Sequence, residues 1–271
     1  LMAQGLPFTQ PAPAAPASPK PPVRVFEEIA RWGAPDARQG VAVDAKHVYA
    51  VTDLGITKHD KASGQVIAKY EGAKGGPVIH FDSAVEVNGK LYAGHSNYPL
   101  EPMTSSVEIF DAATMQHVGT HSFGILLGSC TWIDRHANAW WGVFANYSRV
   151  FGANQRPYGN SYWTTMVKFD EQWRVTQSWL FPNEVIRRAE PMSISGGSWG
   201  PDGLLYATGH DHGEVYVLSI PKFGSVLELV ETVPLPGIQG QGIAWDRSQP
   251  GVLWGIHRAK REVVASRMRG V

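Results

Sequence analysis

The sequence predicts an all-β protein, and more specifically a five-bladed β-propeller whose last blade is closed by the N-terminal strand. Three observations support this fold. A strand pattern that begins with a small residue occurs five times, at intervals of roughly 40 to 50 residues except for one of about 67. Short strands and turns follow one another from Val23 onward, without a long amphipathic helix. The fifth unit holds only three strands.

The clearest copy of the repeat spans residues 196–213. It contains a short strand, a Pro-Asp-Gly turn, a second apolar strand and a loop rich in ionisable groups. The five units begin their first strands at Gly40, Ser83, Cys130, Gly197 and Gly242. Intervals of this length are typical of a four-stranded propeller blade.

The outer strands of each unit can also be assigned. Third strands are expected at residues 56–60, 107–111, 166–170 and 214–218, and fourth strands at 65–70, 117–122, 174–180 and 227–233. In the fifth unit, three strands are expected, at residues 242–246, 252–256 and 262–267.

The missing fourth strand of the fifth unit is predicted at the other end of the chain, at residues 23–29. Pairing of this segment with the last blade would close the ring and remove two exposed sheet edges. A six-bladed ring is the alternative if the long third unit hides another blade, but that unit has no second small-residue start.

Composition limits the partners. Lys plus Arg and Asp plus Glu are equal at 24 each, so charge does not favour nucleic acid or an anionic membrane. No run of 18 apolar residues occurs, and no membrane span is expected. The single cysteine, Cys130, excludes an internal disulfide and is predicted to be a buried structural thiol. We expect a monomer.

The first 22 residues contain seven of the 19 prolines and show no periodic apolar pattern. They are predicted to be a disordered leader, followed by a single propeller domain at residues 23–271. The chain begins without an initiator methionine, which favours a mature form exported to the periplasm or outside the cell. A flexible tail on a cytoplasmic protein is the alternative.

In a propeller, the starts of the first strands and the ends of the second strands meet around one central mouth, so functional groups are expected there. Four histidines lie at such positions: His80, His95, His210 and His257. Neutral imidazole binds divalent metal ions well, so these four are candidate ligands of one such ion. Asp82 or Asp211 would then be a further ligand or partner.

The same mouth also suits acid–base chemistry without a metal. His210 or His80 would transfer protons, oriented by Asp211 or Asp82. Polar side chains at the mouth are candidate substrate contacts: Asn97, Tyr98, Asn146, Tyr147, Gln239, Gln241 and Arg258. The sequence has no phosphate-cradling loop, Gly-x-Ser-x-Gly or His-Glu-x-x-His motif, so neither a nucleotide nor a flavin is expected.

Two long connections, at residues 146–163 and 181–195, fall at the same face and are typical of binding or lid segments. Arg156 and Arg187 in these connections would recognise a carboxylate. Five of the ten tryptophans recur inside strand pairs and are predicted to be core: Trp132, Trp141, Trp199, Trp245 and Trp254. The mouth residues differ between blades, which favours one asymmetric site over several equivalent sugar sites.

Segments at residues 96–99, 105–111, 144–147, 196–200 and 209–211 resemble a group of bacterial propeller proteins labelled cycloisomerase. The resemblance extends from Gly40 to the C-terminus and implies the propeller fold, but it assigns no catalytic residue. The five-bladed architecture is also similar to that of plant-type glutaminyl cyclase, whose catalytic motif is not matched.

The sequence thus predicts an exported enzyme that acts on a small organic molecule, aromatic or carboxylate-bearing, in the central mouth. Metal-assisted or His/Asp acid–base chemistry would make it a lyase, isomerase or hydrolase. The alternative is a non-catalytic propeller that binds a ligand or protein, in which the mouth histidines are incidental.

Overall fold

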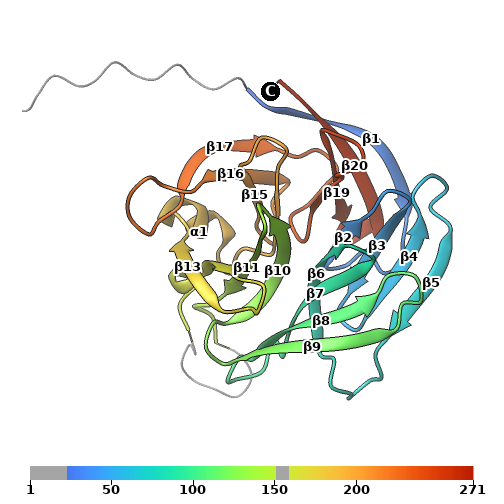
Figure 1. The fold of residues 1–271 in the computed structure, drawn as a ribbon. Coiled ribbons are helices and arrows are strands. Elements are labelled where there is room, and N and C mark those ends of the chain that lie inside the picture. Colours follow the sequence, from blue (N-terminus) through green and yellow to red (C-terminus); the bar gives the residue numbers. More distant parts are fainter. Residues whose placement is uncertain (1–22, 151–158, 271) are drawn as a thin grey trace, which may run out of the picture.

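The computed structural model describes residues 23–150 and 159–270. Five four-stranded antiparallel sheets are arranged in a ring, which confirms the predicted five-bladed β-propeller (Figure 1). The predicted leader at residues 1–22 lies outside the described residues, so its disorder and the export of the protein remain predictions.

The first four blades follow chain order, from an innermost first strand to an outermost fourth strand. Blades 1 and 2 consist of β2 (Gly40–Val43), β3 (His47–Thr52), β4 (Gly55–Asp60), β5 (Val66–Glu71), β6 (His80–Val87), β7 (Lys90–Ser96), β8 (Ser105–Asp111) and β9 (His117–Gly124). Blades 3 and 4 consist of β10 (Ser129–His136), β11 (Ala139–Ala145), β12 (Thr165–Phe169), β13 (Val175–Leu180), β14 (Gly196–Trp199), β15 (Leu205–Thr208), β16 (Glu214–Ser219) and β17 (Glu228–Pro234).

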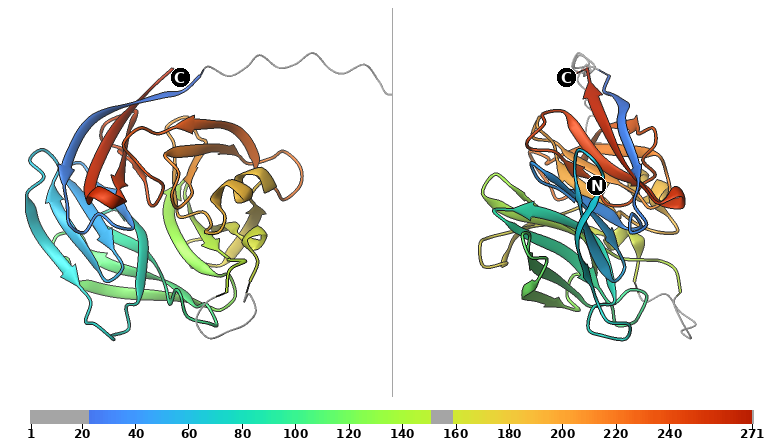
Figure 2. Two further views of the ribbon diagram at one scale, coloured as in Figure 1. Left: turned by 180° about the vertical axis from the view of Figure 1, so that it is seen from behind. Right: turned by 90° about the vertical axis from the view of Figure 1, so that its right-hand side faces the viewer.

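The fifth blade joins the two ends of the chain, as predicted. It consists of β18 (Ala244–Trp245), β19 (Val252–His257), β20 (Glu262–Arg269) and β1 (Val25–Gly33). β1 pairs antiparallel with β20 along its whole length and forms the outer edge of the blade (Figures 1 and 2).

Arg24, just before β1, anchors the start of this closing strand to the fourth blade. Its buried guanidinium donates to the Tyr206 hydroxyl at 3.0 Å and forms ion pairs with Asp202 at 3.1 Å and Glu231 at 2.9 Å. A buried, multiply bonded arginine orders the segment that enters the strand.

Burial falls from the inner to the outer strands. Every residue of β11 is buried, whereas β5 and β13 are mostly exposed. The large rings fill the spaces between neighbouring blades. All five tryptophans predicted to be core are at most 6% exposed, and Cys130 is fully buried, which confirms both predictions.

The first strands of blades 1, 2 and 5 touch at the ring axis. A Cβ added to Gly242 would lie 2.5 Å from the Cβ of Ser83 and 2.9 Å from the Cα of Gly40. The Gly242 N–H donates to the carbonyl of Gln39 at 2.8 Å. Small residues are therefore required at three of the five predicted strand starts, and their contact forms the floor of the mouth.

The connection at residues 181–195 contains a helix that the sequence analysis did not predict, α1 (Asn183–Ala189). Its buried residues Val185, Ile186 and Ala189 join the core between blades 3 and 4. Ala189 packs against Gly209, so this connection lies beside the loop that carries His210, at the mouth as expected. No helix in the described ranges is long and apolar enough to cross a membrane.

Gly242→Ala tests the floor contact. Because the added methyl group overlaps Ser83 and Gly40, we expect a loss of about 1–3 kcal/mol in the free energy of unfolding, measured by urea denaturation. Gly33→Ala is the matched control, since a Cβ there meets nothing within 4 Å. Equal destabilisation of the two variants would contradict the proposed role of the contact.

Candidate functional site

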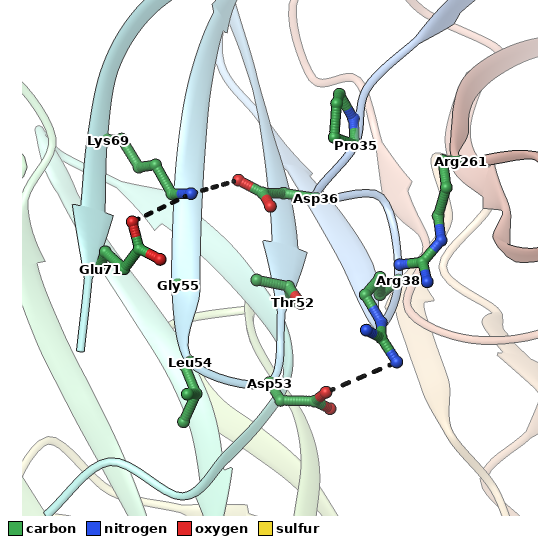
Figure 3. A pocket seen from close by; sticks show the side chains of 10 residues that line it. All are labelled: Pro35, Asp36, Arg38, Thr52, Asp53, Leu54, Gly55, Lys69, Glu71 and Arg261. Atoms are coloured by element: carbon green, nitrogen blue, oxygen red, sulfur yellow. Dashed lines mark ion pairs between the residues drawn. The ribbon is translucent and has the colours of Figure 1, made fainter. Parts of the chain in front are cut away.

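Two of the cavities at the mouth face adjoin one another, where second strands end and third strands begin. The first, of about 380 Å³, is lined by Pro35, Asp36, Arg38, Thr52, Asp53, Leu54, Gly55, Lys69, Glu71 and Arg261 (Figure 3). The second, of about 370 Å³, is lined by His210, Asp211, Gln239, Arg258, Ala259 and Arg261. The first cavity lies between blades 5 and 1 and the second between blades 4 and 5, and they adjoin at Arg261, which lines both.

His210 follows β15 and is held between two charged groups. Its Nε2 lies 2.6 Å from Nη1 of Arg258, and its Nδ1 lies 2.6 Å from Oδ1 of Asp211. A guanidinium can only donate, so Nε2 accepts and Nδ1 carries the proton that is donated to Asp211. The contacts thus fix a neutral imidazole whose Nε2 lone pair faces Arg258. The structure places His210 and Asp211 together, as the sequence analysis expected.

Arg258 is the first residue of the short 3-10 turn after β19, η2 (Arg258–Lys260), and Arg261 is the residue that ends this turn. Arg261 adopts a left-handed backbone conformation, with φ of 56°, which reverses the chain into β20. His257 caps the same turn, because its Nδ1 accepts from the Lys260 N–H at 3.4 Å. The ring of His257 therefore supports the turn.

Three guanidinium groups gather at the junction of the cavities. Arg38 lies 3.9 Å from Asp53, whereas neither Arg258 nor Arg261 forms an ion pair with a carboxylate of the described residues. Burial and the neighbouring charges of Arg38 and Arg258 lower the pKa of Arg261. Figure 3 shows Arg261 extending from blade 5 toward Arg38. In the second cavity, Arg258 and Arg261 outnumber the single carboxylate of Asp211, which favours an anionic ligand.

His80, at the start of β6, lies between two carboxylates. Its Nδ1 is 3.0 Å from Asp53 and its Nε2 is 3.5 Å from Asp82. Burial opposes its charge, but Asp82 and Asp53 outweigh burial and raise the pKa of His80 to about 10. The hydrogen bond from His80 in turn lowers the pKa of Asp53 to about 2. His80 is thus an imidazolium at neutral pH and has no lone pair with which to accept a proton.

His95 is committed to internal hydrogen bonds. Its Nε2 accepts from the backbone N–H of Ile79 at 3.0 Å, so its Nδ1 donates to the hydroxyl of Ser106 at 2.9 Å. Ser106 passes the hydrogen bond on to Glu108 at 2.6 Å. Burial lowers the pKa of His95 and keeps the ring neutral. Its function in the structure is to hold the segment that leads into β6.

The predicted set of four metal-binding histidines is not brought together. His95 has both ring nitrogens occupied, His80 donates to carboxylates, and His257 caps a turn. Within residues 23–150 and 159–270, no three His, Cys, Asp or Glu side chains are arranged to hold a metal ion. Residues at equivalent strand positions point to different partners here, so these four rings do not face one centre, and binding of a metal ion stays a prediction.

Several candidate substrate contacts are used to build the mouth. The Asn97 amide donates to the Pro102 carbonyl at 2.8 Å and accepts from the Thr104 N–H at 2.7 Å. The Asn146 amide donates to the Leu127 carbonyl at 3.2 Å. Asn97 therefore holds its own loop, and Asn146 ties the loop after β11 to the loop before β10.

The remaining candidates divide into supporting and accessible groups. The buried Gln241 donates to the His210 carbonyl at 3.1 Å, and Tyr98 lies 5.0 Å from the His80 ring and 5.4 Å from the buried Tyr147 ring. Gln239 and Arg258 line the second cavity. Arg187 is exposed on α1, and Arg156 lies outside the described residues.

Three site residues were not among the sequence candidates: Arg38, Asp53 and Arg261. Arg38 and Asp53 lie next to the strand start and strand end of blade 1, so the register used for the other blades could have found them. Arg261 follows a short turn that no residue pattern in the sequence predicts. Only the ring closure brings it beside blade 1.

Comparisons with known proteins agree with the architecture. No family model matches the chain, and a comparison with curated proteins gave no match. The PQQ-bound aldose sugar dehydrogenase of Streptomyces coelicolor is 10% identical, with a TM-score of 0.54 over 93% of this chain and 100% of that one. The likeness shows a β-propeller fold.

Two further solved structures have lower scores. The WD40 propeller domain of Doa1 is 11% identical, with a TM-score of 0.45 over 83% of this chain and 77% of that one. A chain of the mitotic checkpoint complex is 11% identical, with a TM-score of 0.43 over 84% of this chain and 62% of that chain, less than two thirds of its length. The resemblance to cycloisomerase-labelled propellers remains a prediction.

The pKa values of His80 and Asp53 predict how stability depends on pH. The pKa of His80 is raised from 6.5, so its ion pairs stabilise the fold fully below about pH 6.5 and are lost as pH rises toward 10. The pKa of Asp53 is lowered from 3.8, so its contribution is present above that pH and is lost as pH falls toward 2.

The measurement is the free energy of unfolding across this range for the wild type and His80→Gln. The variant should lose the part of the alkaline decline that His80 causes. His212→Gln, at an exposed position, is the control. Parallel curves for the wild type and His80→Gln would show that the ion pairs do not form as described.

Proposed function

We propose that the protein is an enzyme that acts on a small carboxylate-bearing organic molecule in the mouth, with His210 as the group that transfers a proton. The observation that carries the proposal is the second cavity, in which His210, oriented by Asp211, lies beside Arg258 and Arg261. A histidine oriented by a carboxylate and adjacent to an anion-binding group is a common arrangement for acid–base catalysis.

The substrate carboxylate would bind the guanidinium groups of Arg258 and Arg261. Arg258 would then exchange its hydrogen bond with His210 Nε2 for charge-assisted bonds to the carboxylate, which are the stronger ones. This frees the Nε2 lone pair at the moment when a substrate is present.

Nε2 can then accept a proton from the substrate, which yields an imidazolium. Asp211 stabilises that cation through the hydrogen bond from Nδ1. Return of the proton to another position of the substrate completes an isomerisation, and its transfer to a leaving group completes an elimination. His80 keeps its proton between Asp53 and Asp82, whose two carboxylates compensate its charge, so it takes no part in the proton transfer.

A binding protein without catalysis is the second candidate. The observation in its favour is that Arg258 occupies the His210 lone pair, while Asp211 is 69% exposed and so stabilises a cation less. In that case the arginines would hold the same carboxylate and His210 would only position Arg258.

The arginine site is tested first by ligand-observed NMR with a panel of small organic carboxylates. Arg258→Gln should weaken binding by about 10- to 100-fold, because a charge-assisted hydrogen bond is worth about 1.5–3 kcal/mol. Arg174→Gln, which changes an exposed arginine in the turn before β13, should bind like the wild type. Equal affinities of the wild type and Arg258→Gln would contradict the site.

Catalysis is then tested with the carboxylates that bind. His210→Ala should lower kcat by about 100-fold or more, the usual contribution of a proton-transfer group, with an unchanged melting temperature. His212→Ala, two residues further on and exposed, should retain the wild-type rate. Chemical conversion that survives in His210→Ala rejects His210 as the catalytic group, and binding without conversion in the wild type favours the second candidate.

A further inference from the structure

A separate cavity of about 250 Å³ lies at the face opposite the mouth, where the first strands end. Three blades contribute to it through His136 at the end of β10, Trp199 at the end of β14 and Trp245 at the end of β18. The rest of the lining is Gly200, Pro201, Asp246, Arg247, Pro250 and Gly251. The proposed reaction at the mouth uses none of these residues.

Aromatic rings form the walls of this cavity and are supported from behind. The His136 ring stacks on Trp199 with centroids 4.6 Å apart and planes 10° apart, and Trp141 packs on Trp199 at 4.8 Å. Trp245 is held by Tyr206 at 4.9 Å in an edge-on contact. These contacts fix both indoles to the core, so the walls resist collapse into the cavity.

The charges around the cavity cancel. Arg247 forms an ion pair with the buried Asp134, and Asp246 forms one with Lys61 at 2.8 Å. Burial lowers the pKa of His136, so its ring is neutral at neutral pH. A charged ligand would lose its hydration here without finding an unpaired opposite charge. The cavity therefore differs in kind from the mouth, where two guanidinium groups have no carboxylate partner among the described residues.

We infer that this cavity binds an uncharged aromatic molecule of one or two rings, such as a phenol or an indole, in contact with Trp199 and Trp245. An apolar cavity of about 150 Å³ is large enough to bind benzene, so this one has room for a second ring. Arg247 is half exposed at the rim, and a guanidinium favours the face of an electron-rich ring. The rigid aromatic walls favour a flat molecule over an aliphatic one of the same size.

The test uses the full chain and three probes: indole, benzoate as the charged aromatic, and cyclohexanol as the uncharged aliphatic. Ligand-observed NMR titrations should show saturable binding of indole that is at least several-fold tighter than that of the other two. His136→Ala removes the ring stacked on Trp199 and should weaken indole binding by about three- to tenfold. Pro250→Trp, at an exposed position of the rim, should fill the cavity and weaken binding further.

Trp163→Leu is the control, because it removes an indole that is 60% exposed elsewhere on the molecule. Circular dichroism and melting temperatures establish that each variant is folded. Failure of indole to bind up to its solubility limit overturns the inference, as does binding that only Trp163→Leu abolishes. Binding of benzoate as tight as that of indole overturns the charge argument. Tighter binding of a tryptophan-containing peptide than of indole overturns the small-molecule assignment and identifies a protein-docking site.

Discussion

The contact between first strands at the ring axis is the constraint on which the rest of this propeller depends. Gly40, Ser83 and Gly242 meet so closely that a larger side chain at Gly242 would overlap its neighbours. Once the backbones touch there, the first strands of blades 1, 2 and 5 have a fixed height along the axis. Gln39, Asp82 and Gln241, which directly precede the three contact residues, then lie around one mouth. The site is a consequence of this packing.

Ring closure adds the second condition for the site. Arg258 and Arg261 belong to the last blade, whereas Arg38 and Asp53 belong to the first. They share a wall only because β1 completes the last blade along β20 and the following chain enters β2 at once. Pairing of the two end strands therefore controls the geometry of the candidate site, because it brings together Arg38 and Arg261, which lie far apart in sequence.

Most of the fold could be predicted from the sequence, but less of the candidate site could be. The five small residues and the tryptophans predicted the blades because close packing leaves them few alternatives. The helix α1 has seven residues, too few for a clear apolar periodicity. The pairing of His80 with Asp53 joins two blades, and the bond from Ile79 to His95 depends on the path of a loop. Such partners are decided by side-chain direction, which strand register does not specify.

The two faces of the ring differ in how their charges are compensated. At the mouth, Arg258 and Arg261 find no carboxylate among the described side chains, and a neutral histidine accepts the one strong hydrogen bond that Arg258 donates. At the opposite face, Asp134 and Asp246 each have a cationic partner. Unpaired charge attracts a ligand of opposite sign. Where the charges are paired, the aromatic side chains determine which ligand binds. The ring thus has two arginines without a carboxylate partner among the described side chains at one end and an aromatic cavity with paired charges at the other.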